Sequence, residues 1–560
     1  MNLIKKNNKK GENSFNVNLY NKIRCYFKSL TYKDYIKFLI IFLILIISYY
    51  IFMKFTLIIT VDGSKYYSYL DYFKGIKNIG TWDTIRGFSF PLIIYLITLL
   101  FGANIRGIVF GFYLFYIGML FFGYKIIATL IVENKIKKSQ ITIWMLYLLA
   151  FLFNPLIIGY GHTLLTEAIT PFFYVMLIYI CIKWNKMSFR KSKKQFIIYS
   201  VIIVLLSVFV WFIKQPYAPA IWIMIFTASI LSGLYNHNCH IFLQKFLVFI
   251  ICLISTFISV KAWNLLIESH NESKIINITN SSILANTLEG YSYHFIQLNK
   301  DTYCSIEYVK NSVLDENDKQ KVYDLINNNA EWCDFVNFYD ITGIDGNRLE
   351  QLIIIKNNKD LSLSESLSFL IKAYVNHPVL VAHSYFENYL GIINLERVNS
   401  NYVASGRIEP NVGGENAAIA YITFHEGYKN AWWLWQDKKQ LSNELIELST
   451  GMENYESVTN TDSVLSPIME ILSDGSNLSF KLLLLICFPV MVYAFIRYLI
   501  NKKSISYFVI TLLSATSFGH IMFHVFTGAI IDRYCYPVYP LMLLCLIAMI
   551  MEKNSTNEKM

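Results

Sequence analysis

Charged side chains are scarce in this chain of 560 residues, because Asp, Glu, Lys and Arg together make up only 16% of it. A soluble globular protein carries about 25% of such residues. The deficit is uneven, since long apolar runs alternate with short basic clusters and one long polar block interrupts them. This pattern excludes an ordinary soluble protein and predicts a multi-pass α-helical membrane protein with an inserted soluble domain.

Several motifs of soluble enzymes are also missing. The sequence contains no P-loop, no Rossmann glycine pattern, no nucleophile elbow and no zinc signature. The loops expected in the cytoplasm are short, which argues against a nucleotide-hydrolysing domain within this chain. His520 and His524 lie four residues apart on one face of an expected helix. Without a third ligand they are interpreted as packed core histidines.

The net charge of +10 averages two parts of opposite sign. Residues 263–477 carry 29 acidic and 14 basic side chains, whereas the rest of the chain carries 10 acidic and 35 basic ones. The basic residues outside the polar block lie in short loops between apolar runs, where positive charge sets the orientation of membrane spans. Nucleic acid is therefore not an expected partner, and membrane lipids are.

A helix needs about 20 apolar residues to cross the hydrocarbon core of a bilayer. Ten candidate spans meet this need, at 38–60, 107–131, 141–160, 168–184, 196–214, 217–235, 243–262, 478–500, 504–527 and 536–551. The apolar stretch Phe88–Gly102 is shorter, and we expect it to lie in or dip into the outer interface. Counting it as a span would invert every later loop and would break the agreement with the positive-inside rule.

The loops fix the expected orientation and domain order. With the basic N-terminus inside, the clusters at 133–138, 183–194 and 497–503 all fall in the cytoplasm, and the acidic block falls outside. Whether Cys304 and Cys333 of that block form a disulfide stays open. The expected parts are a cytoplasmic N-terminus 1–36, a membrane domain 37–262 with an outer loop 61–106, an extracytoplasmic domain 263–477 of mixed or mainly helical structure, the last three spans in 478–551, and a cytoplasmic tail 552–560. We expect the protein in the plasma membrane.

Five acidic residues outside the polar block fall at the expected outer boundary of the spans, namely Asp62, Asp71, Asp83, Glu167 and Asp532. A carboxylate at the mouth of a span is costly to desolvate. Each one taken singly is interpreted as an ordinary interfacial residue, but Asp62 and Glu167 together indicate function. One could take a proton from an acceptor hydroxyl, while the other orients the acceptor or a metal ion.

Three cations are expected at the same membrane level: Arg86, Lys214 and Arg533. They run against the positive-inside bias and are therefore more informative than the many cytoplasmic lysines. Arg binds phosphate with a planar fork and Lys binds it as a point charge, so a phosphate-bearing lipid is one expected ligand. The alternative for each cation is that it anchors the chain or pairs with a carboxylate.

The order of these features resembles the GT-C superfamily of membrane glycosyltransferases, which includes the bacterial lipid A aminoarabinose transferases and the protein O-mannosyltransferases. Members carry an Asp just after the first span, followed by a Tyr-rich stretch and a basic residue, which correspond here to Asp62, Tyr66-Tyr67 and Arg86. A phrase like Pro-Leu-Ile-Ile-Tyr-Leu-Ile-Thr-Leu-Leu-Phe-Gly follows at 91–102. Later landmarks are Leu-Thr-Glu at 165–167 and Arg-Tyr-Cys-Tyr-Pro-Val-Tyr-Pro at 533–540.

The resemblance implies that a sugar moves from a polyprenyl-phosphate carrier to an extracytoplasmic glycan, lipid or protein acceptor. By that analogy Asp62 is the catalytic base, Glu167 assists, and Arg86, Lys214 and Arg533 hold the carrier phosphate. Tyr66, Tyr67 and His162 are further substrate-binding candidates. Many members have two adjacent acidic residues after the first span, whereas Gly63 follows Asp62 here. A divalent metal cofactor, Mg²⁺ or Mn²⁺, therefore stays open.

Three other functions remain as alternatives. A transporter or flippase for lipid-linked glycans would carry polar residues near the bilayer centre, and the candidate spans show few. A non-catalytic assembly protein that has kept the scaffold would not need Asp62 or Glu167. A glycan polymerase of another membrane fold would depend mainly on arginines.

Overall fold

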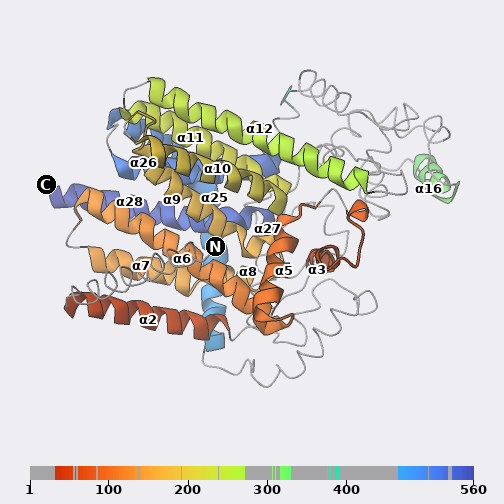
Figure 1. Cartoon of the computed structure of the whole chain (residues 1–560), viewed down its shortest axis with the longest axis horizontal. Helices are drawn as coiled ribbons and strands as arrows, with labels where there is room; N and C mark the ends of the chain where they lie inside the picture. The colour runs from red at the N-terminus through yellow and green to blue at the C-terminus, as the bar shows by residue number, and fades with distance from the viewer. Residues whose placement is uncertain are drawn as a thin grey trace, which may run out of the picture. The chain divides into compact units, whose positions relative to one another are not determined.

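The computed structural model describes residues 32–53, 61–82, 86–136, 139–190, 192–236, 239–270, 316–328, 465–501, 504–526 and 532–559, together with a few isolated positions. These residues form helices, and no β-strand occurs among them (Figure 1). The chain divides into two compact units, residues 1–54 and residues 55–560. The first unit contributes one described helix, α2, and all other described elements belong to the second.

The described helices and 3₁₀ turns follow one another in this order: α2 Tyr32–Phe52, α3 Val61–Ser68, α4 Leu70–Phe73, η1 Ile79–Thr81, α5 Ser89–Phe101, α6 Ile105–Asn134, α7 Gln140–Leu152, α8 Pro155–Gly161, η2 Thr166–Ala168, α9 Thr170–Asn185, α10 Lys193–Ile213, η3 Gln215–Tyr217, α11 Ala218–Asn236, α12 Cys239–Ser269, α16 Glu316–Asn327, α25 Leu465–Ile500, α26 Ile505–Phe526, α27 Asp532–Cys535, η7 Tyr536–Val538 and α28 Tyr539–Lys559.

Eight helical segments among the described residues are long and apolar enough to cross a membrane. Each coincides with one of the ten predicted spans, so the prediction of a multi-pass helical membrane protein is confirmed at that level. The physical reason is that lipid offers no hydrogen-bond partners, and a helix satisfies its own backbone groups. The eight segments are Ile105–Asn134, Thr166–Asn185, Lys193–Ile213, Gln215–Leu234, Cys239–Ser269, Leu478–Ile500, Ile505–Val525 and Tyr536–Asn554.

The two other predicted spans differ from expectation. The span predicted over 141–160 is interrupted, because α7 ends at Leu152 and α8 starts at Pro155 with a bend of 44° between them. Together the two helices are long and apolar enough for one broken span or a re-entrant loop. The side chain of Asn154 accepts hydrogen bonds from the backbone N–H groups of Leu156 and Ile157 and so caps the second helix. In the predicted first span, the apolar part of α2 is Leu39–Phe52, and residues 54–56 and 58–60 lie outside the described residues.

Helix α5 covers the stretch that the sequence marks as too short to span. It has 13 residues, from Ser89 to Phe101, and is therefore about 20 Å long against a hydrocarbon core of about 30 Å. It ends at Gly102, whose φ of 92° is open to glycine and strained for other residues. The prediction of a separate short helix is confirmed, and its place in a membrane interface stays a prediction.

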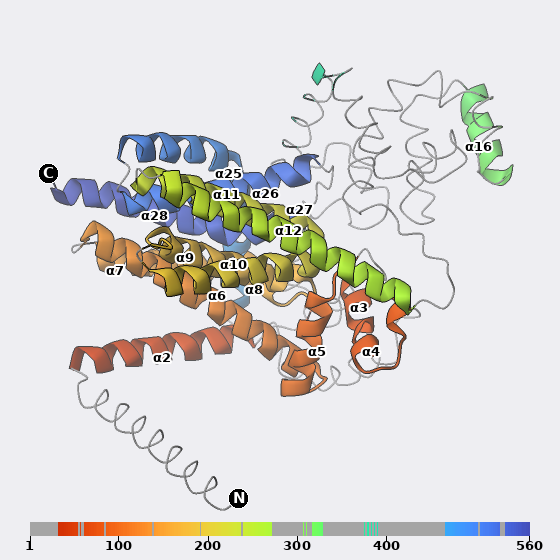
Figure 2. The same cartoon turned by 45° about the horizontal axis from the view of Figure 1, so that its top comes forward.

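The connections between the spans in the second unit sort into two ends. At one end, Lys186 pairs with Glu133, and the Asn134 side chain donates to the Ser506 hydroxyl at 2.6 Å. The buried ammonium of Lys245 donates to the carbonyl oxygen of Trp184 at 2.7 Å at the same end. Helices α3 and α4 and the start of α5 gather at the other end, away from the C-terminus of α28 (Figure 2). We call this second end the site end.

The helices next to the polar block are longer than predicted. Helix α12 continues to Ser269, and α25 begins at Leu465, so both extend beyond the boundaries predicted at 262 and 478. Between these two helices the structure describes α16 and a few isolated positions. Cys304 and Cys333 lie outside the described residues.

Candidate functional site

The Glu167 carboxylate is fully buried, with no solvent exposure. It lies in the short turn η2, which opens the span that contains α9. Its Oε1 accepts hydrogen bonds from Lys214 Nζ at 2.9 Å and from the Tyr217 hydroxyl at 2.8 Å. Its Oε2 accepts from the Thr166 hydroxyl at 2.8 Å. These donors and the opposite charge offset the cost of burying the carboxylate.

Lys214 is held by an anion and by aromatic rings. The residue follows the last residue of α10, and its side chain is 15% exposed. Its ammonium lies 3.8 Å from the centroid of the Tyr534 ring and 5.1 Å from that of the Tyr217 ring, both within the range of a cation–π interaction. In the structure this cation pairs with the Glu167 carboxylate, and its role in phosphate binding stays a prediction.

A layer of polar contacts backs the Glu167–Lys214 pair. His520 of α26 is fully buried, and its Nε2 lies 2.7 Å from the carbonyl oxygen of Tyr534. Its Nδ1 lies 3.3 Å from the hydroxyl of Tyr174, which donates to the carbonyl oxygen of Tyr217 at 2.9 Å. His524 is also fully buried, and its ring lies 4.8 Å from that of His520. Both histidines are packed in the core, as the sequence predicted.

The backbone segment of Asp62 is placed at the site end by the close packing of its neighbour Gly63. A Cβ atom placed on Gly63 would lie 2.7 Å from the carbonyl oxygen of Leu164, so the start of α3 packs directly on the segment that leads to Glu167. Only glycine permits such a close backbone approach. The side chain of Asp62 lies outside the described residues. At the level of the backbone, the segments of the two predicted carboxylates are therefore adjacent.

Arg86 is brought in by a second glycine. A Cβ atom on Gly87 would lie 2.1 Å from the carbonyl oxygen of Phe212, which precedes Lys214 by two residues. The Arg86 carbonyl oxygen accepts a hydrogen bond from the Trp82 indole at 2.8 Å, and the Arg86 guanidinium lies 5.8 Å from the centroid of the Tyr66 ring. The segment of Arg86 therefore packs against the end of α10 that carries Lys214.

The other predicted substrate-binding residues are mostly buried. Tyr66 packs edge-on against Phe90, with ring centroids 4.9 Å apart, and Tyr67 is 3% exposed. His162 is fully buried, and its Nδ1 lies 2.6 Å from the carbonyl oxygen of Ile158 one helical turn earlier. Because a carbonyl only accepts, this nitrogen carries the proton. The His162 ring therefore forms a hydrogen bond with the backbone of the last turn of α8.

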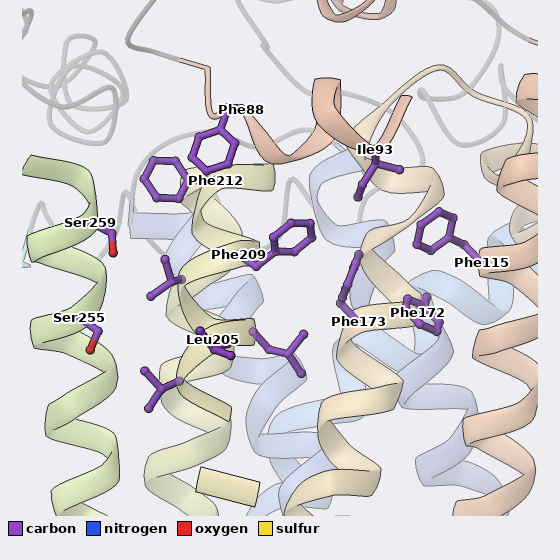
Figure 3. Close-up of a pocket in the computed structure, with 13 residues that line it drawn as sticks. Phe88, Ile93, Phe115, Phe172, Phe173, Leu205, Phe209, Phe212, Ser255 and Ser259 are labelled. Atoms are coloured by element: carbon purple, nitrogen blue, oxygen red, sulfur yellow. The ribbon is translucent and has the colours of Figure 1, made fainter. Parts of the chain in front are cut away.

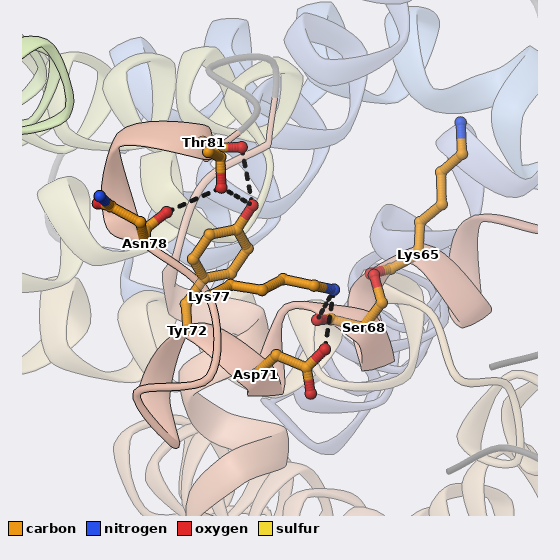
Figure 4. Close-up of polar contacts among 7 residues, drawn as sticks. All are labelled: Lys65, Ser68, Asp71, Tyr72, Lys77, Asn78 and Thr81. Atoms are coloured by element: carbon orange, nitrogen blue, oxygen red, sulfur yellow. Dashed lines mark hydrogen bonds and ion pairs between the residues drawn. The ribbon is translucent and has the colours of Figure 1, made fainter. Parts of the chain in front are cut away.

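The segment of Arg533 lies beside Lys214, whereas Asp71 forms a separate local ion pair. Arg533 belongs to the short helix α27, and although its own side chain is outside the described residues, its neighbour Tyr534 covers Lys214. Asp71 pairs with Lys77 at 2.8 Å, and the same ammonium donates to the Ser68 carbonyl oxygen at 3.2 Å (Figure 4). This local ion pair matches the interpretation of Asp71 as an ordinary interfacial residue. Asp83 and the side chain of Asp532 are outside the described residues.

The contacts of Glu167 do not suit a metal ligand. One of its oxygens already accepts from an ammonium and a phenol, and the other accepts from a hydroxyl. A divalent cation in contact with Glu167 would stand beside the Lys214 ammonium and would be repelled by it. Among the residues that the structure describes, no three His, Cys, Asp or Glu side chains cluster to hold a metal ion. Glu167 therefore fits an anchor for Lys214.

An apolar groove of about 730 Å³ runs along the bundle below the site end (Figure 3). Its wall is formed by α5, α6, α9, α10 and α12, and Ser255 and Ser259 are the polar residues among those that line it. Phe88 and Phe212 stand together at one end of the groove, with ring centroids 4.5 Å apart. Leu205 on the wall is 63% exposed, so the groove is open at the surface of the helical bundle. Because Phe88 follows Gly87 and Phe212 precedes Lys214 by two residues, this end adjoins the cations.

Sequence reasoning missed three residues of this site. Tyr217 and Tyr534 contact Glu167 and Lys214 directly, and Tyr174 links His520 to the turn that carries Tyr217. A signal for Tyr217 exists in Lys-Gln-Pro-Tyr, because the proline starts a 3₁₀ turn in which residues three apart face the same way. Tyr174 has no such local signal, since one Tyr within an apolar helix is ordinary.

Comparisons with known proteins assign neither a family nor a function to this chain. No family model matches the chain, and searches of curated proteins and of solved structures return no significant match.

Proposed function

We propose that the chain is a membrane glycosyltransferase of the GT-C type, which moves a sugar from a polyprenyl-phosphate carrier to an acceptor. The single observation that carries the proposal is the meeting of four distant segments at one end of the bundle. Gly63 packs on Leu164, Gly87 packs on Phe212, and Lys214 pairs with Glu167. The carboxylates and cations that the reaction needs therefore belong to adjoining backbone segments.

The apolar groove supports a lipid-linked donor. Its volume falls within the 300–1,000 Å³ that small-molecule sites usually have, and its lining is almost wholly apolar. An isoprenoid chain entering from the lipid would lie along α10, with its phosphate at the end marked by Phe88 and Phe212. There the phosphate meets the Arg86 segment and Lys214. A fork of guanidinium donors and a nearby ammonium are the groups that hold phosphate in proteins.

In the proposed reaction, the acceptor oxygen attacks the anomeric carbon of the donor sugar. The bond from that carbon to the carrier phosphate oxygen breaks, and its electron pair leaves with the phosphate. Asp62 takes the proton of the acceptor hydroxyl. Arg86, Lys214 and Arg533 stabilise the negative charge that develops on the phosphate, so the leaving group needs no proton. Glu167 acts through Lys214, by holding its ammonium at the site.

The proposed location is the outer face of the plasma membrane. The basic connections gather at the end opposite the site, which under the positive-inside rule is the cytoplasmic end. The domain predicted at 263–477 would then lie above the site and select a glycan, lipid or protein acceptor. An outward-facing site of this kind suits the assembly of cell-envelope glycans.

Transfer in membranes tests the proposal. Membranes that contain the full chain are supplied with a radiolabelled pool of polyprenyl-phosphate sugars, and label in non-carrier products is measured. We expect transfer by the unaltered protein and its loss in Asp62→Asn, which keeps the size of the side chain but cannot take a proton. The matched control is Asp71→Asn, whose carboxylate pairs locally with Lys77 and should leave transfer intact. Full transfer by Asp62→Asn would contradict the mechanism.

A further inference from the structure

We propose that His520 is a positioning residue that holds both partners of Lys214 in place. The imidazole makes two hydrogen bonds, one at each ring nitrogen, and their partners lie in different segments of the chain. Nε2 lies 2.7 Å from the carbonyl oxygen of Tyr534, and Nδ1 lies 3.3 Å from the hydroxyl of Tyr174. The His520 side chain is fully buried, and its contact with Tyr534 is partly buried.

The first contact controls the ring that covers Lys214. A carbonyl oxygen only accepts, so Nε2 carries the proton and donates to Tyr534. This bond joins the span α26 to the short helix α27 across 14 residues of sequence. The ring of the same Tyr534 lies 3.8 Å from the Lys214 ammonium. His520 thus holds the backbone of the residue whose side chain covers the cation.

The second contact reaches the anion that pairs with Lys214. With Nε2 protonated in a neutral ring, Nδ1 is an acceptor for the Tyr174 hydroxyl. The single proton of that hydroxyl is shared between Nδ1 at 3.3 Å and the carbonyl oxygen of Tyr217 at 2.9 Å, and the Tyr217 hydroxyl donates to Glu167 at 2.8 Å. The rings of Tyr217 and His520 pack with centroids 5.4 Å apart. The His520 imidazole is therefore connected both to Tyr534, whose ring covers Lys214, and to Glu167, which pairs with Lys214.

As a consequence, the position of the Lys214 ammonium depends on His520, although the two side chains are linked only through other residues. If the Nε2–H donor is lost, Tyr534 is released from α26 and the Lys214 ammonium becomes more open to solvent. The loss of one hydrogen bond of ordinary net strength corresponds to about a fivefold change in such an opening equilibrium. The positioning is a property of the fold, and its effect on catalysis rests on the proposed function.

Chemical labelling of Lys214 tests the positioning without any substrate. The full chain in detergent is treated with a limiting amount of an amine-reactive acetylating ester, and modification of the Lys214 peptide is measured by mass spectrometry. His520→Phe keeps a ring of similar size but has no donor, and we expect about fivefold faster acetylation. His520→Gln keeps an N–H donor and should restore slow acetylation. Lys77, which is 41% exposed, serves as the internal control in every sample.

Equal acetylation of Lys214 in His520→Phe and the unaltered protein would overturn the inference, as would a failure of His520→Gln to restore protection in protein that elutes as a single folded species. Transfer assays on the same variants separate the two proposals. If the unaltered protein transfers no sugar while Lys214 protection still follows the donor at position 520, the proposed function fails and the positioning stands. If transfer occurs, we expect a lower turnover in His520→Phe that His520→Gln restores.

Discussion

Lys214 and Tyr217 donate to the same oxygen of Glu167, at 2.9 and 2.8 Å. The two donors are three residues apart, and the 3₁₀ turn Gln215–Tyr217 between them brings positions i and i+3 to one side. Pro216 suits this turn because its fixed φ favours the helical region and it has no N–H to leave unpaired. A local turn thus forms a two-donor clamp for a carboxylate that lies 47 residues earlier in the chain.

The ion pair should show strong coupling between its members. Glu167→Gln leaves the Lys214 ammonium without its counter-charge, and Lys214→Met leaves a fully buried carboxylate without its cation. Breaking a buried pair from one side costs about 3–5 kcal/mol, whereas removing both charges costs much less. The loss of stability in the double variant should therefore be smaller than the sum of the losses in the two single variants, by at least about 1 kcal/mol. Unfolding of the solubilised protein measures this, and additive changes would contradict the pairing.

Gly87 should tolerate no side chain. Alanine at this position would place its Cβ 2.1 Å from the backbone oxygen of Phe212, and a backbone atom at the end of α10 cannot move aside without shifting Lys214. We expect Gly87→Ala to cost about 1–3 kcal/mol of stability and to lower transfer. The control is Gly475→Ala in α25, where a Cβ meets open space and alanine favours the helix. The packing argument fails if the two variants have equal thermal stability and equal transfer.

Filling the groove should weaken the use of long-chain carriers selectively. Ser255 lines the groove, and tryptophan at this position would occupy space that an isoprenoid chain needs. We expect Ser255→Trp to raise the KM for a long-chain polyprenyl-phosphate sugar about tenfold or more, and to change the KM for a short-chain donor much less. Leu247→Trp on the same helix is the control, because Leu247 is 58% exposed and does not line the groove. An equal effect of Ser255→Trp on both donors would rule out the groove as the chain site.

The site end should be accessible from outside the cell. Ile76 is 67% exposed at this end, and Arg190 is exposed in the connection after α9 at the other end. A membrane-impermeant maleimide added to intact cells should label Ile76→Cys and should leave Arg190→Cys unlabelled until the membrane is opened. The parent chain gives the background from native cysteines, including the exposed Cys239. The reverse labelling order would place the site in the cytoplasm and would contradict the proposed donor.

The helical spans were predictable because their cause is local. A run of about 20 apolar residues in lipid has one way to satisfy its backbone polar groups, so its length and composition suffice. The break between α7 and α8 was missed although it also has a local cause. Asn154 caps the second helix and Pro155 occupies its first position, a pair that marks a helix start as clearly inside an apolar run as outside one.

The members of the candidate site were only partly predictable. Glu167 and Lys214 stood out because a charge at the mouth of a span needs a reason, but their pairing joins residues 47 positions apart. The same limit applies to His520, which local pattern could identify only as a buried histidine. Its two contacts involve residues from α27 and α9, and no periodicity within α26 points to either of them.

The sequence by itself determined the helical membrane class, the eight described helices that are long and apolar enough to span, and the shortness of α5. The reason is that hydrophobic length and helix geometry act within one segment. Only the tertiary structure decided which charges meet. Close packing at Gly63 and Gly87 brings four distant segments together, and the low-polarity interior then makes each buried charge find a partner. That selection depends on side chains from several helices at once, which no single stretch of sequence contains.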